Sequence, residues 1–553
     1  MKNEQTDRYD AIIIGSGLGG LATASLLAQM AGKRVLVLER HSKLGGFTHC
    51  FRRKHHEWDT GVHYVGEMQY GSQTRQVMDF VTGGGIQWNS LGDPFEHFVF
   101  PQETFDLPDN QPDILAALVK RFPDEQAALE QYFRDIQKMR DWMVRWYVGK
   151  TLPDWMASLL TMFRRRMATM NTGEYLAKQF RDPFLRAVIA AQWPDFGTPP
   201  SDSSFAFHGI VSGDFLNGGY FPAGGGTVLA EHTKNVIEAH GGACLVNRSV
   251  KNILIENGKA TGVVAIHKEK EVTYRAPIVI SNAGGVITFG KLCPEGHGIR
   301  ERKRIARITP GPSVNVLYLG LKEDPRKHGF DAGNYWLYAR TDHNLEADPN
   351  NPEQVDGCYF GFGSLRNPGQ EPHTAQIISF SEDRHWARWD NTKWKRRGED
   401  YEQKKAATAE ALLDHVELFF PRFRDLIDYQ ELSTPLTVKT FTDHWHGTIY
   451  GSVCNQHRLY RDRWPVKTSV KNLYLTGSDV GIPGVNGALM SGVMTAGTLL
   501  APLGIGVARI MMRAERVHKR RAKAEGNASQ QVAPAVSTQS AKLPNSQEEE
   551  VNV

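Results

Sequence analysis

The sequence predicts an α/β fold in which both ends of the chain contribute to one parallel sheet. Residues 11–14 form a short apolar run that ends in a glycine-rich turn, and residues 472–475 form a second run that also ends at a glycine. Short apolar runs bounded by glycine are typical of strands buried in a parallel sheet. The chain has 553 residues, which is too long for one ordinary core, so we expect two or more subdomains.

The turn after the first strand has the spacing of a nucleotide-binding loop. Gly15, Gly17 and Gly20 fit the pattern G-x-G-x-x-G. In such a loop the first glycine permits a tight turn, the second lets a pyrophosphate approach the backbone, and the third lets helix and strand pack closely. A helix over 18–31 would then point its free N–H groups at the phosphates. These residues predict a Rossmann-type dinucleotide site.

Glu39 indicates which dinucleotide fits. It ends a second apolar strand, 35–38, and lies nineteen residues after Gly20. An acidic side chain at this place accepts hydrogen bonds from a ribose and disfavours a 2′-phosphate. The site therefore suits FAD or NAD better than NADP.

Two further glycine turns favour FAD. Gly45 and Gly46 follow directly after the ribose acid, and Gly477-x-Asp479 lies between the strand 472–475 and a helix that we expect from about Asn486. The amides and the carboxylate of this last turn could hold a pyrophosphate and a ribityl chain. The sequence has no second G-x-G-x-x-G motif that would indicate a separate NAD(P)H domain.

These motifs resemble those of the flavin amine oxidase and phytoene desaturase superfamily, and within it the carotenoid and retinoid oxidoreductases. Residues 219–227 look like the family's Pro-x-Gly-Gly element, and 276–283 look like its strand that returns under the flavin. Residues 244–250 look like the strand whose valine, here Val250, contacts the FAD adenine. The resemblance extends over about 9–500. It implies an α/β fold: a Rossmann-type FAD-binding domain with an inserted α+β substrate domain.

The motifs and the resemblance together imply one FAD site. Its expected residues are Gly15, Ser16, Gly17, Leu18, Gly19, Gly20, Glu39, Arg40, Gly45, Gly46, Phe47, Thr48, Val250, Asn282, Gly477, Asp479, Asn486, Gly487 and Ala488. The sequence departs from the amine-oxidase pattern at Lys43, where an arginine is common, and this weakens the analogy to amine oxidation.

The segment Asp-Thr-Gly-Val-His-Tyr at 59–64 indicates the branch of the superfamily. It looks like the corresponding segment of retinol-saturase-like proteins, because classical carotene desaturases share Asp-x-Gly but usually lack the histidine. The resemblance implies an FAD-dependent oxidoreductase of the CH–CH class that acts on C=C bonds of a long apolar polyene or lipid, with reduction favoured. A carotenoid desaturase or a cis–trans isomerase is the alternative.

His63 and Tyr64 are the candidate catalytic residues, because both can donate near neutral or higher pH. Each could supply a proton or orient the substrate; alternatively, His63 only hydrogen-bonds the flavin or the backbone. A further polar and aromatic group lines the substrate cavity or packs over it as a loop: His444, Trp445, His446 and Tyr450. The sequence shows no metal-ligand spacing, so we expect no metal.

A protein of another class could share this fold. Rab GDP-dissociation inhibitors resemble it and bind prenylated proteins without redox chemistry, so a non-redox lipid-binding escort is an alternative. The flavin residues Glu39, Gly45, Gly46, Gly477 and Asp479 separate the two and favour the enzyme.

Composition limits the partners. A net charge of +4 gives no reason to expect nucleic acid, and five widely spaced cysteines fit a reducing compartment. Residues 1–10 are polar and show no hydrophobic signal region, so we expect a cytoplasmic protein, with contact to a membrane surface as a further option. The expected partner is an apolar small molecule or lipid, and the oligomeric state is left open.

We expect a discontinuous arrangement of domains. The FAD-binding domain comprises 1–100, 205–300 and 465–510, and the substrate domain comprises 101–204 and 301–464. A basic amphipathic segment, 511–525, and a disordered tail, 526–553, follow.

Two segments raise the question of membrane contact. Residues 142–170 combine aromatic side chains with Arg164, Arg165 and Arg166, as interfacial helices do, but a helix packed on the substrate domain has the same pattern. Residues 480–508 carry no charge, which a buried flavin helix explains better than a membrane span. The basic stretch 503–523 could lie on a membrane surface.

Overall fold

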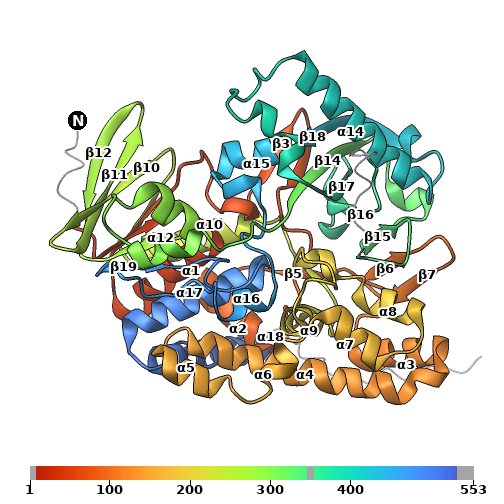
Figure 1. Ribbon diagram of the computed structural model, residues 1–553, viewed down its shortest axis with the longest axis horizontal. Helices are drawn as coiled ribbons and strands as arrows, with labels where there is room; N and C mark the ends of the chain where they lie inside the picture. Colours follow the sequence, from red (N-terminus) through yellow and green to blue (C-terminus); the bar gives the residue numbers. More distant parts are fainter. Residues whose placement is uncertain (1–7, 345–353, 532–553) are drawn as a thin grey trace, which may run out of the picture.

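A parallel sheet of five strands is assembled from three distant parts of the chain (Figure 1). The computed structural model describes residues 8–344 and 354–531. The strands lie in the order β19-β13-β1-β2-β9, and each neighbouring pair is parallel. Their bounds are β1 Ala11–Ile14, β2 Val35–Leu38, β9 Ala243–Leu245, β13 Val279–Ser281 and β19 Leu473–Leu475.

Close helix packing joins the two ends of the chain over this sheet. Helix α1 (Leu18–Ala31) packs against α17 (Gly484–Leu500) and α10 (Thr227–Ala239). A Cβ atom on Gly492 of α17 would lie 2.6 Å from the Cβ atom of Ala22 on α1, so small residues are required at this crossing. The α1–α17 pair therefore fixes the C-terminal glycine turn beside the N-terminal one.

A seven-stranded sheet forms the second layer, at the upper right of Figure 1, with α14 (Glu399–Glu417) packed on it. The strand order is β18-β14-β17-β16-β15-β6-β7, and only the β15–β6 pair is parallel. The bounds are β6 Glu96–Val99, β7 Thr104–Leu107, β14 Ser313–Leu321, β15 Asn334–Tyr338, β16 Gly357–Gly361, β17 Thr374–Ser381 and β18 Ile427–Ser433.

Helices cover the lower side of the molecule (Figure 1), and α4 packs against α9 there. Their bounds are α2 Gln73–Thr82, α3 Gln111–Arg121, α4 Gln126–Gly149, α5 Asp154–Leu160, α6 Arg165–Ala168, α7 Thr172–Gln179, α8 Pro183–Ala190, α9 Phe205–Asp214 and α18 Ile505–Gln531. The remaining helices are α11 Gly285–Ile287, α12 Ile299–Ile305, α13 Gly363–Arg366, α15 Pro435–Thr442 and α16 Gln456–Leu459.

Smaller strand pairs complete the fold. An antiparallel three-stranded sheet, at the left of Figure 1, follows β9. Two further antiparallel pairs are the hairpin β3–β4 and the pair β5–β8, whose strands are distant in the sequence. The bounds are β10 Ser249–Glu256, β11 Lys259–His267, β12 Lys270–Arg275, β3 Cys50–Arg53, β4 His56–Asp59, β5 Trp88–Ser90 and β8 Tyr220–Pro222.

The structure corrects one expected strand. Residues 244–250 do not form a single strand, because the chain turns at Asn247, where φ is +52°. The amide of Arg248 then donates to the Glu39 carbonyl at 2.7 Å, and β10 begins at Ser249. This turn brings Arg248 beside Glu39, the expected ribose acid, and places Val250 in the wall of the cavity.

The expected domain boundary near residue 100 falls inside a hairpin. β6 and β7 lie on either side of it and pair with each other, and β6 also pairs with β15 of the seven-stranded sheet. The chain therefore enters the larger sheet before residue 100. The division into two domains stays a proposal.

The C-terminal helices pack on the protein. α17 is largely buried, and α18 places Val507, Ile510 and Ala514 in the core beside α17 and α2. Part of the apolar side of the 503–523 segment is thus used within the fold, whereas Leu503, Ile505 and Met512 are exposed. α18 continues through residues 526–531, which were expected to be disordered, and residues 532–553 of that expected tail lie outside the described residues.

Among the described residues, no helix by itself has the length and apolar character to cross a bilayer. α17 and α18 would do so only as a pair, and the chain bends by 119° between them.

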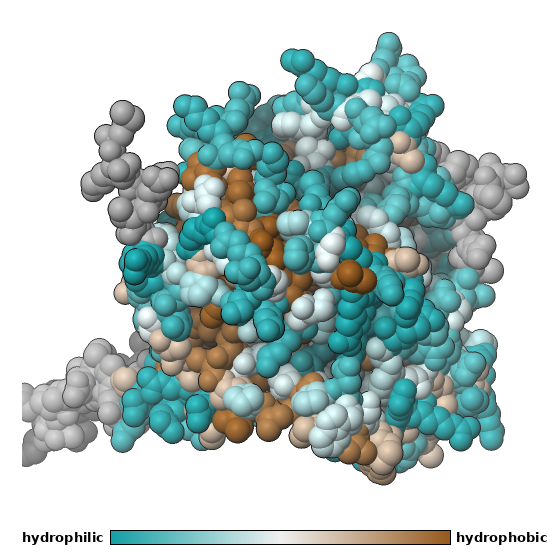
Figure 2. All heavy atoms as spheres, turned by 60° about the vertical axis from the view of Figure 1, so that its left-hand side comes forward, coloured by the Kyte–Doolittle hydropathy of each residue, from teal (hydrophilic) through white to brown (hydrophobic). Residues whose placement is uncertain are grey.

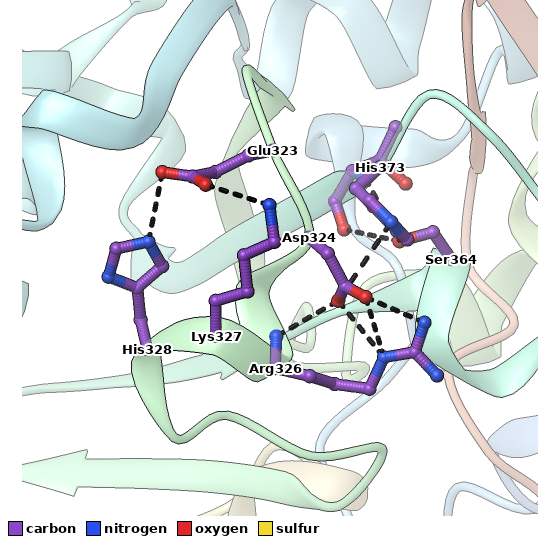
Figure 3. A network of polar contacts seen from close by, with 8 residues as sticks. Glu323, Asp324, Arg326, Lys327, His328, Ser364 and His373 are labelled. Atoms are coloured by element: carbon purple, nitrogen blue, oxygen red, sulfur yellow. Dashed lines mark hydrogen bonds and ion pairs between the residues drawn. The ribbon is translucent and has the colours of Figure 1, made fainter.

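An exposed turn between β14 and β15 carries a dense polar cluster (Figure 3). Oδ1 of Asp324 accepts hydrogen bonds of 3.0 Å from both the backbone amide and Nε of Arg326. Glu323 accepts from Lys327 and His328, each at 3.2 Å. The hydrogen bond from Arg326 lowers the pKa of Asp324 to about 2. These bonds cap a short 3-10 turn, which accounts for the cluster without a chemical role.

Candidate functional site

A cavity of about 700 Å³ lies between the five-stranded and seven-stranded sheets. At one end its wall is formed by the turns after β1, β2 and β19. At the other end it is formed by aromatic and aliphatic side chains of β14, β15 and β17: Val314, Val316, Tyr318, Trp336, Tyr338, Ile378 and Phe380. A polar backbone-lined channel therefore opens into an apolar chamber.

Glu39 is fixed at the polar end by the first glycine turn. Its Oε2 accepts hydrogen bonds from the amide and the hydroxyl of Ser16, at 2.8 and 2.6 Å. Its Oε1 accepts from the His41 amide at 2.8 Å. The Ser16 hydroxyl in turn accepts from the Gly45 amide at 3.0 Å. The carboxylate is thus held rigidly at the edge of the cavity.

The glycines of the three turns lie so close to their neighbours that a residue with a Cβ atom would not fit at these positions. A Cβ atom on Gly17 would lie 2.8 Å from Nδ2 of Asn282, and one on Gly19 would lie 2.7 Å from the Cα atom of Gly477. A Cβ atom on Gly46 would lie 3.1 Å from the Cα atom of Gly17. The three expected glycine turns therefore form one continuous cradle of backbone.

Most of the expected cofactor residues line this cavity. They are Gly15, Gly17, Leu18, Gly19, Glu39, Arg40, Gly45, Gly46, Phe47, Thr48, Val250, Asn282, Gly477, Asp479 and Ala488. The cradle, the ribose acid at one end and the Asp479 turn at the other fit an extended dinucleotide such as FAD.

Four of the expected residues do not line the cavity. Ser16 holds Glu39 from behind, and Gly20 faces the carbonyl of Gly15 inside the turn. Asn486 donates through Nδ2 to the Gly66 carbonyl at 3.0 Å, and Gly487 packs on the carbonyl of Ile482. These residues support the turns.

Asp59 explains the role of the Asp-x-Gly motif in the fold. Its Oδ1 accepts from the Gly226 amide at 2.5 Å and from the Cys50 thiol at 3.3 Å. Burial raises the pKa of this carboxyl to about 6. The motif thus clasps the Pro-x-Gly-Gly turn that precedes α10.

His63 lies in the cavity wall, and its surroundings keep it neutral. Its carbonyl accepts from Nη1 of Arg366 at 2.7 Å, and its ring lies 5.1 Å from the ring of Tyr359. Burial, and then the charge of Arg366, lower the pKa of His63 to about 3. A neutral imidazole can orient a ligand but carries no excess proton to give.

Tyr64 leads to two acids that sequence motifs did not reveal. Its hydroxyl donates to Oδ2 of Asp195 at 2.5 Å, and its ring stacks on Phe215 with centroids 4.4 Å apart. Glu96, further from the cavity, accepts from the indole of Trp336 at 2.5 Å. Asp195 lies 131 positions from Tyr64 and has no motif around it, so only the fold brings these groups together.

Three of the four residues expected to line or cover the substrate cavity do line it. His444, Trp445 and Tyr450 line the cavity, and the His444 ring meets Phe47 edge-on with centroids 5.2 Å apart. His446 is outside the cavity and is hydrogen-bonded to Asp383.

One cluster among the described residues could hold a metal, although none was expected. Ligand atoms of His55, His56 and Asp428 lie within 4.8 Å of one another. The cluster lies outside the cavity, and Nε2 of His56 is 3.2 Å from Oδ2 of Asp428.

Comparisons with known proteins agree with the geometry of the cradle. The family described as flavin containing amine oxidoreductase matches residues 18–500. All-trans-retinol 13,14-reductase of Danio rerio is 32% identical over 89% of this chain and 86% of its own length. Prolycopene isomerase 1 of an Oncidium hybrid cultivar is 26% identical over 91% and 86%. Cyclohexylamine oxidase of Brevibacterium oxydans has a similar fold, with a TM-score of 0.57 at 14% identity over 92% of this chain and all of the other.

Proposed function

The chain belongs to the family of flavin-containing amine oxidoreductases and is an FAD-dependent oxidoreductase, and we propose that it reduces a C=C bond in a long apolar polyene. When bound, FAD supplies two-electron chemistry, in the form of a hydride, to a substrate placed beside it. The protein's own part is to bind the substrate, exclude water and provide a proton.

The observation that carries this proposal is the apolar chamber beside the glycine cradle. Its wall brings together the indoles of Trp193 and Trp336, the phenol ring of Tyr338 and the phenyl ring of Phe380. The rings of Trp193 and Phe380 lie 5.0 Å apart. Flat, rigid rings suit a conjugated chain. The 32% identity to a retinol reductase supports the same substrate class.

An isomerase or a desaturase would use the same chamber, as the similarity to a prolycopene isomerase suggests. Product mass separates these activities. The flavin of the purified protein is reduced without oxygen and mixed with retinoids, carotenoids and unsaturated lipids. A gain of two hydrogens supports the proposed reductase. An unchanged mass with an altered spectrum, or a loss of two hydrogens with oxidised protein, would replace it by an isomerase or a desaturase.

The escort alternative is tested by colour. An oxidoreductase of this family should purify with the visible absorbance of bound flavin or regain it when FAD is added. A colourless protein that does not take up FAD but binds prenylated peptides would favour a lipid escort.

We also propose that α5 and α6 contact an anionic membrane surface, from which an apolar substrate could enter. The side chains of Trp142, Trp146 and Tyr147 are buried in the protein. Trp155, Leu159, Met162 and Phe163 are instead 59–66% exposed and precede Arg164, Arg165 and Arg166. Apolar rings beside arginines suit the boundary between lipid chains and phosphates. Figure 2 shows hydrophobic residues among hydrophilic ones along the lower edge of this side.

Vesicle flotation tests this surface. The wild type should float with anionic vesicles more than with zwitterionic ones, and serine at the four exposed apolar positions should abolish the difference. Leu418→Ser is the matched control, since Leu418 is 71% exposed at the end of α14. Equal flotation of the wild type and the fourfold variant would contradict the proposed contact.

The five free cysteines favour a location on the cytoplasmic side of the membrane.

A further inference from the structure

Three groups form a connected chain from the protein interior to the apolar chamber. Glu96 is fully buried and is fixed by Trp336 at 2.5 Å and by Nε2 of Gln192 at 3.2 Å. Tyr64 lies between the acids: it donates to Asp195 at 2.5 Å and interacts with the Glu96 carboxyl. Tyr64 and Asp195 line the cavity and Glu96 does not. A substrate can therefore reach Tyr64 and Asp195, and of the two acids only Asp195 is accessible from the cavity.

The surroundings of Asp195 favour its protonated form. Burial raises the pKa of the Asp195 carboxyl to about 7, although the hydrogen bond from Tyr64 lowers it. Burial, and then the charge of Asp195, raise the pKa of Glu96 to about 8. The other titratable groups that interact with Asp195 are the phenols of Tyr338, Tyr359 and Tyr450, which carry no charge near neutral pH. No cation among the groups acting on it stabilises the carboxylate.

We propose that Asp195 is the acid that protonates the substrate carbon in the reduction, and that Tyr64 and Glu96 position it and return its proton. The inference rests on the proposed function of reducing a C=C bond. The hydride brings its electron pair to one carbon, and the π pair of the C=C bond forms a new C–H bond at the other carbon with the proton of Asp195. The O–H pair stays on Asp195 as carboxylate. Glu96 then restores the proton through the Tyr64 hydroxyl.

The position of Trp193 and Phe380 supports this assignment. Both rings line the chamber, and Trp193 is two residues from Asp195 on the same short 3-10 turn, Trp193–Asp195. A polyene lying along these rings would pass beside the carboxyl. His63, in contrast, is held neutral and cannot provide the proton as readily.

Carboxyl variants test the proton transfer. Asp195→Asn should keep its flavin and its reduction by dithionite but oxidise reduced flavin with the polyene at least about 100-fold more slowly, because a positioned general acid contributes about 10²–10⁴-fold. Asp195→Glu should regain part of the rate. Tyr64→Phe and Glu96→Gln should slow repeated turnover more than the first turnover. Asp141→Asn, on the exposed side of α4, is the control.

A second measurement does not depend on turnover. In infrared titrations of the substrate-free holoprotein, the difference between the wild type and Asp195→Asn should contain a protonated carboxyl band that disappears as the pH rises through about 7. Taking the difference removes the band of Asp214, whose pKa burial also raises to about 7. A wild-type turnover rate in Asp195→Asn would overturn the inference while leaving the reductase in place. If the wild type reduces no polyene, the proposed function fails. A difference spectrum without the carboxyl band would overturn the assignment of Asp195 independently.

Discussion

The carbonyl of Gly19 accepts a 3.3 Å hydrogen bond from the hydroxyl of Thr476, although 457 positions separate the two residues. The Thr476 hydroxyl also lies 3.1 Å from that of Thr23 on α1. This contact locks the start of α1 to the end of β19. The turn at Gly19 therefore serves two purposes: it forms part of the cofactor cradle, and it joins the N-terminal part of the sheet to the C-terminal part.

Gly19→Ala should weaken both functions of this junction. The new Cβ atom would lie 2.7 Å from the Cα atom of Gly477 and 2.8 Å from Oγ of Ser491, so the turns must separate. Overpacking of this kind costs about 1–3 kcal/mol. We expect a lower thermal unfolding midpoint and a lower ratio of flavin to protein absorbance.

The control for that variant is Gly290→Ala. At Gly290 the nearest atom to a new Cβ would be Cδ1 of Ile305, at 3.8 Å, which is ordinary contact. Its flavin content should equal that of the wild type. If Gly19→Ala also had the flavin content of the wild type, the close approach of the two glycine turns would not be needed for cofactor binding.

Asp59→Ala should destabilise the turn before α10. It removes the acceptor of the Gly226 amide and of the Cys50 thiol, and a buried donor left without its partner costs about 1–3 kcal/mol. We expect a lower denaturant midpoint, measured at pH 7.5. Asp141→Asn, at an exposed position, is the control and should keep the midpoint of the wild type. An unchanged midpoint for Asp59→Ala would contradict the proposed stabilising role of the Asp59 contacts.

The first half of the cofactor site could be predicted from short-range patterns in the sequence. The strand over 11–14, the glycine spacing after it and Glu39 lie within one local segment, so sequence distance sets their geometry. The strand break at Asn247 was not predicted. An asparagine with a positive φ changes the direction of the chain without changing the pattern of apolar residues from which strands are predicted. Asp195 and Glu96 were missed for another reason: their chemistry comes from burial and from Tyr64, and both depend on tertiary packing.

The buried, neutral His208 should contribute stability that is lost in acid. Burial lowers the pKa of His208 from 6.5 to about 4, so between these pH values the unfolded chain binds more protons than the folded one. The stability contributed by this group is complete above pH 6.5 and is lost as the pH falls toward 4, by up to about 1.4 kcal/mol per pH unit.

His208→Gln isolates this effect, since buried carboxyls such as Asp214 titrate in both proteins. The variant loses the 2.9 Å contact between Tyr132 and the ring, so its stability at pH 7 will be lower. Unfolding free energies from urea titrations at pH 6.5 and 4.5 should nevertheless differ less in the variant than in the wild type. An equal difference in both would exclude His208 as the cause.

His63→Ala should retain bound flavin and weaken substrate binding, whereas Asp195→Asn should slow the chemical step. The imidazole is neutral and rests against Tyr359, so its removal should disturb the placement of the substrate. We expect a raised KM and a rate of the first turnover, at saturating polyene, within about tenfold of the wild type, whereas loss of a general acid lowers that rate by about 10²-fold or more. Stopped-flow oxidation of the reduced flavin in water and in deuterium oxide separates the two. The solvent isotope effect of the wild type should persist in His63→Ala. If it disappeared, His63 and not Asp195 would be the proton donor.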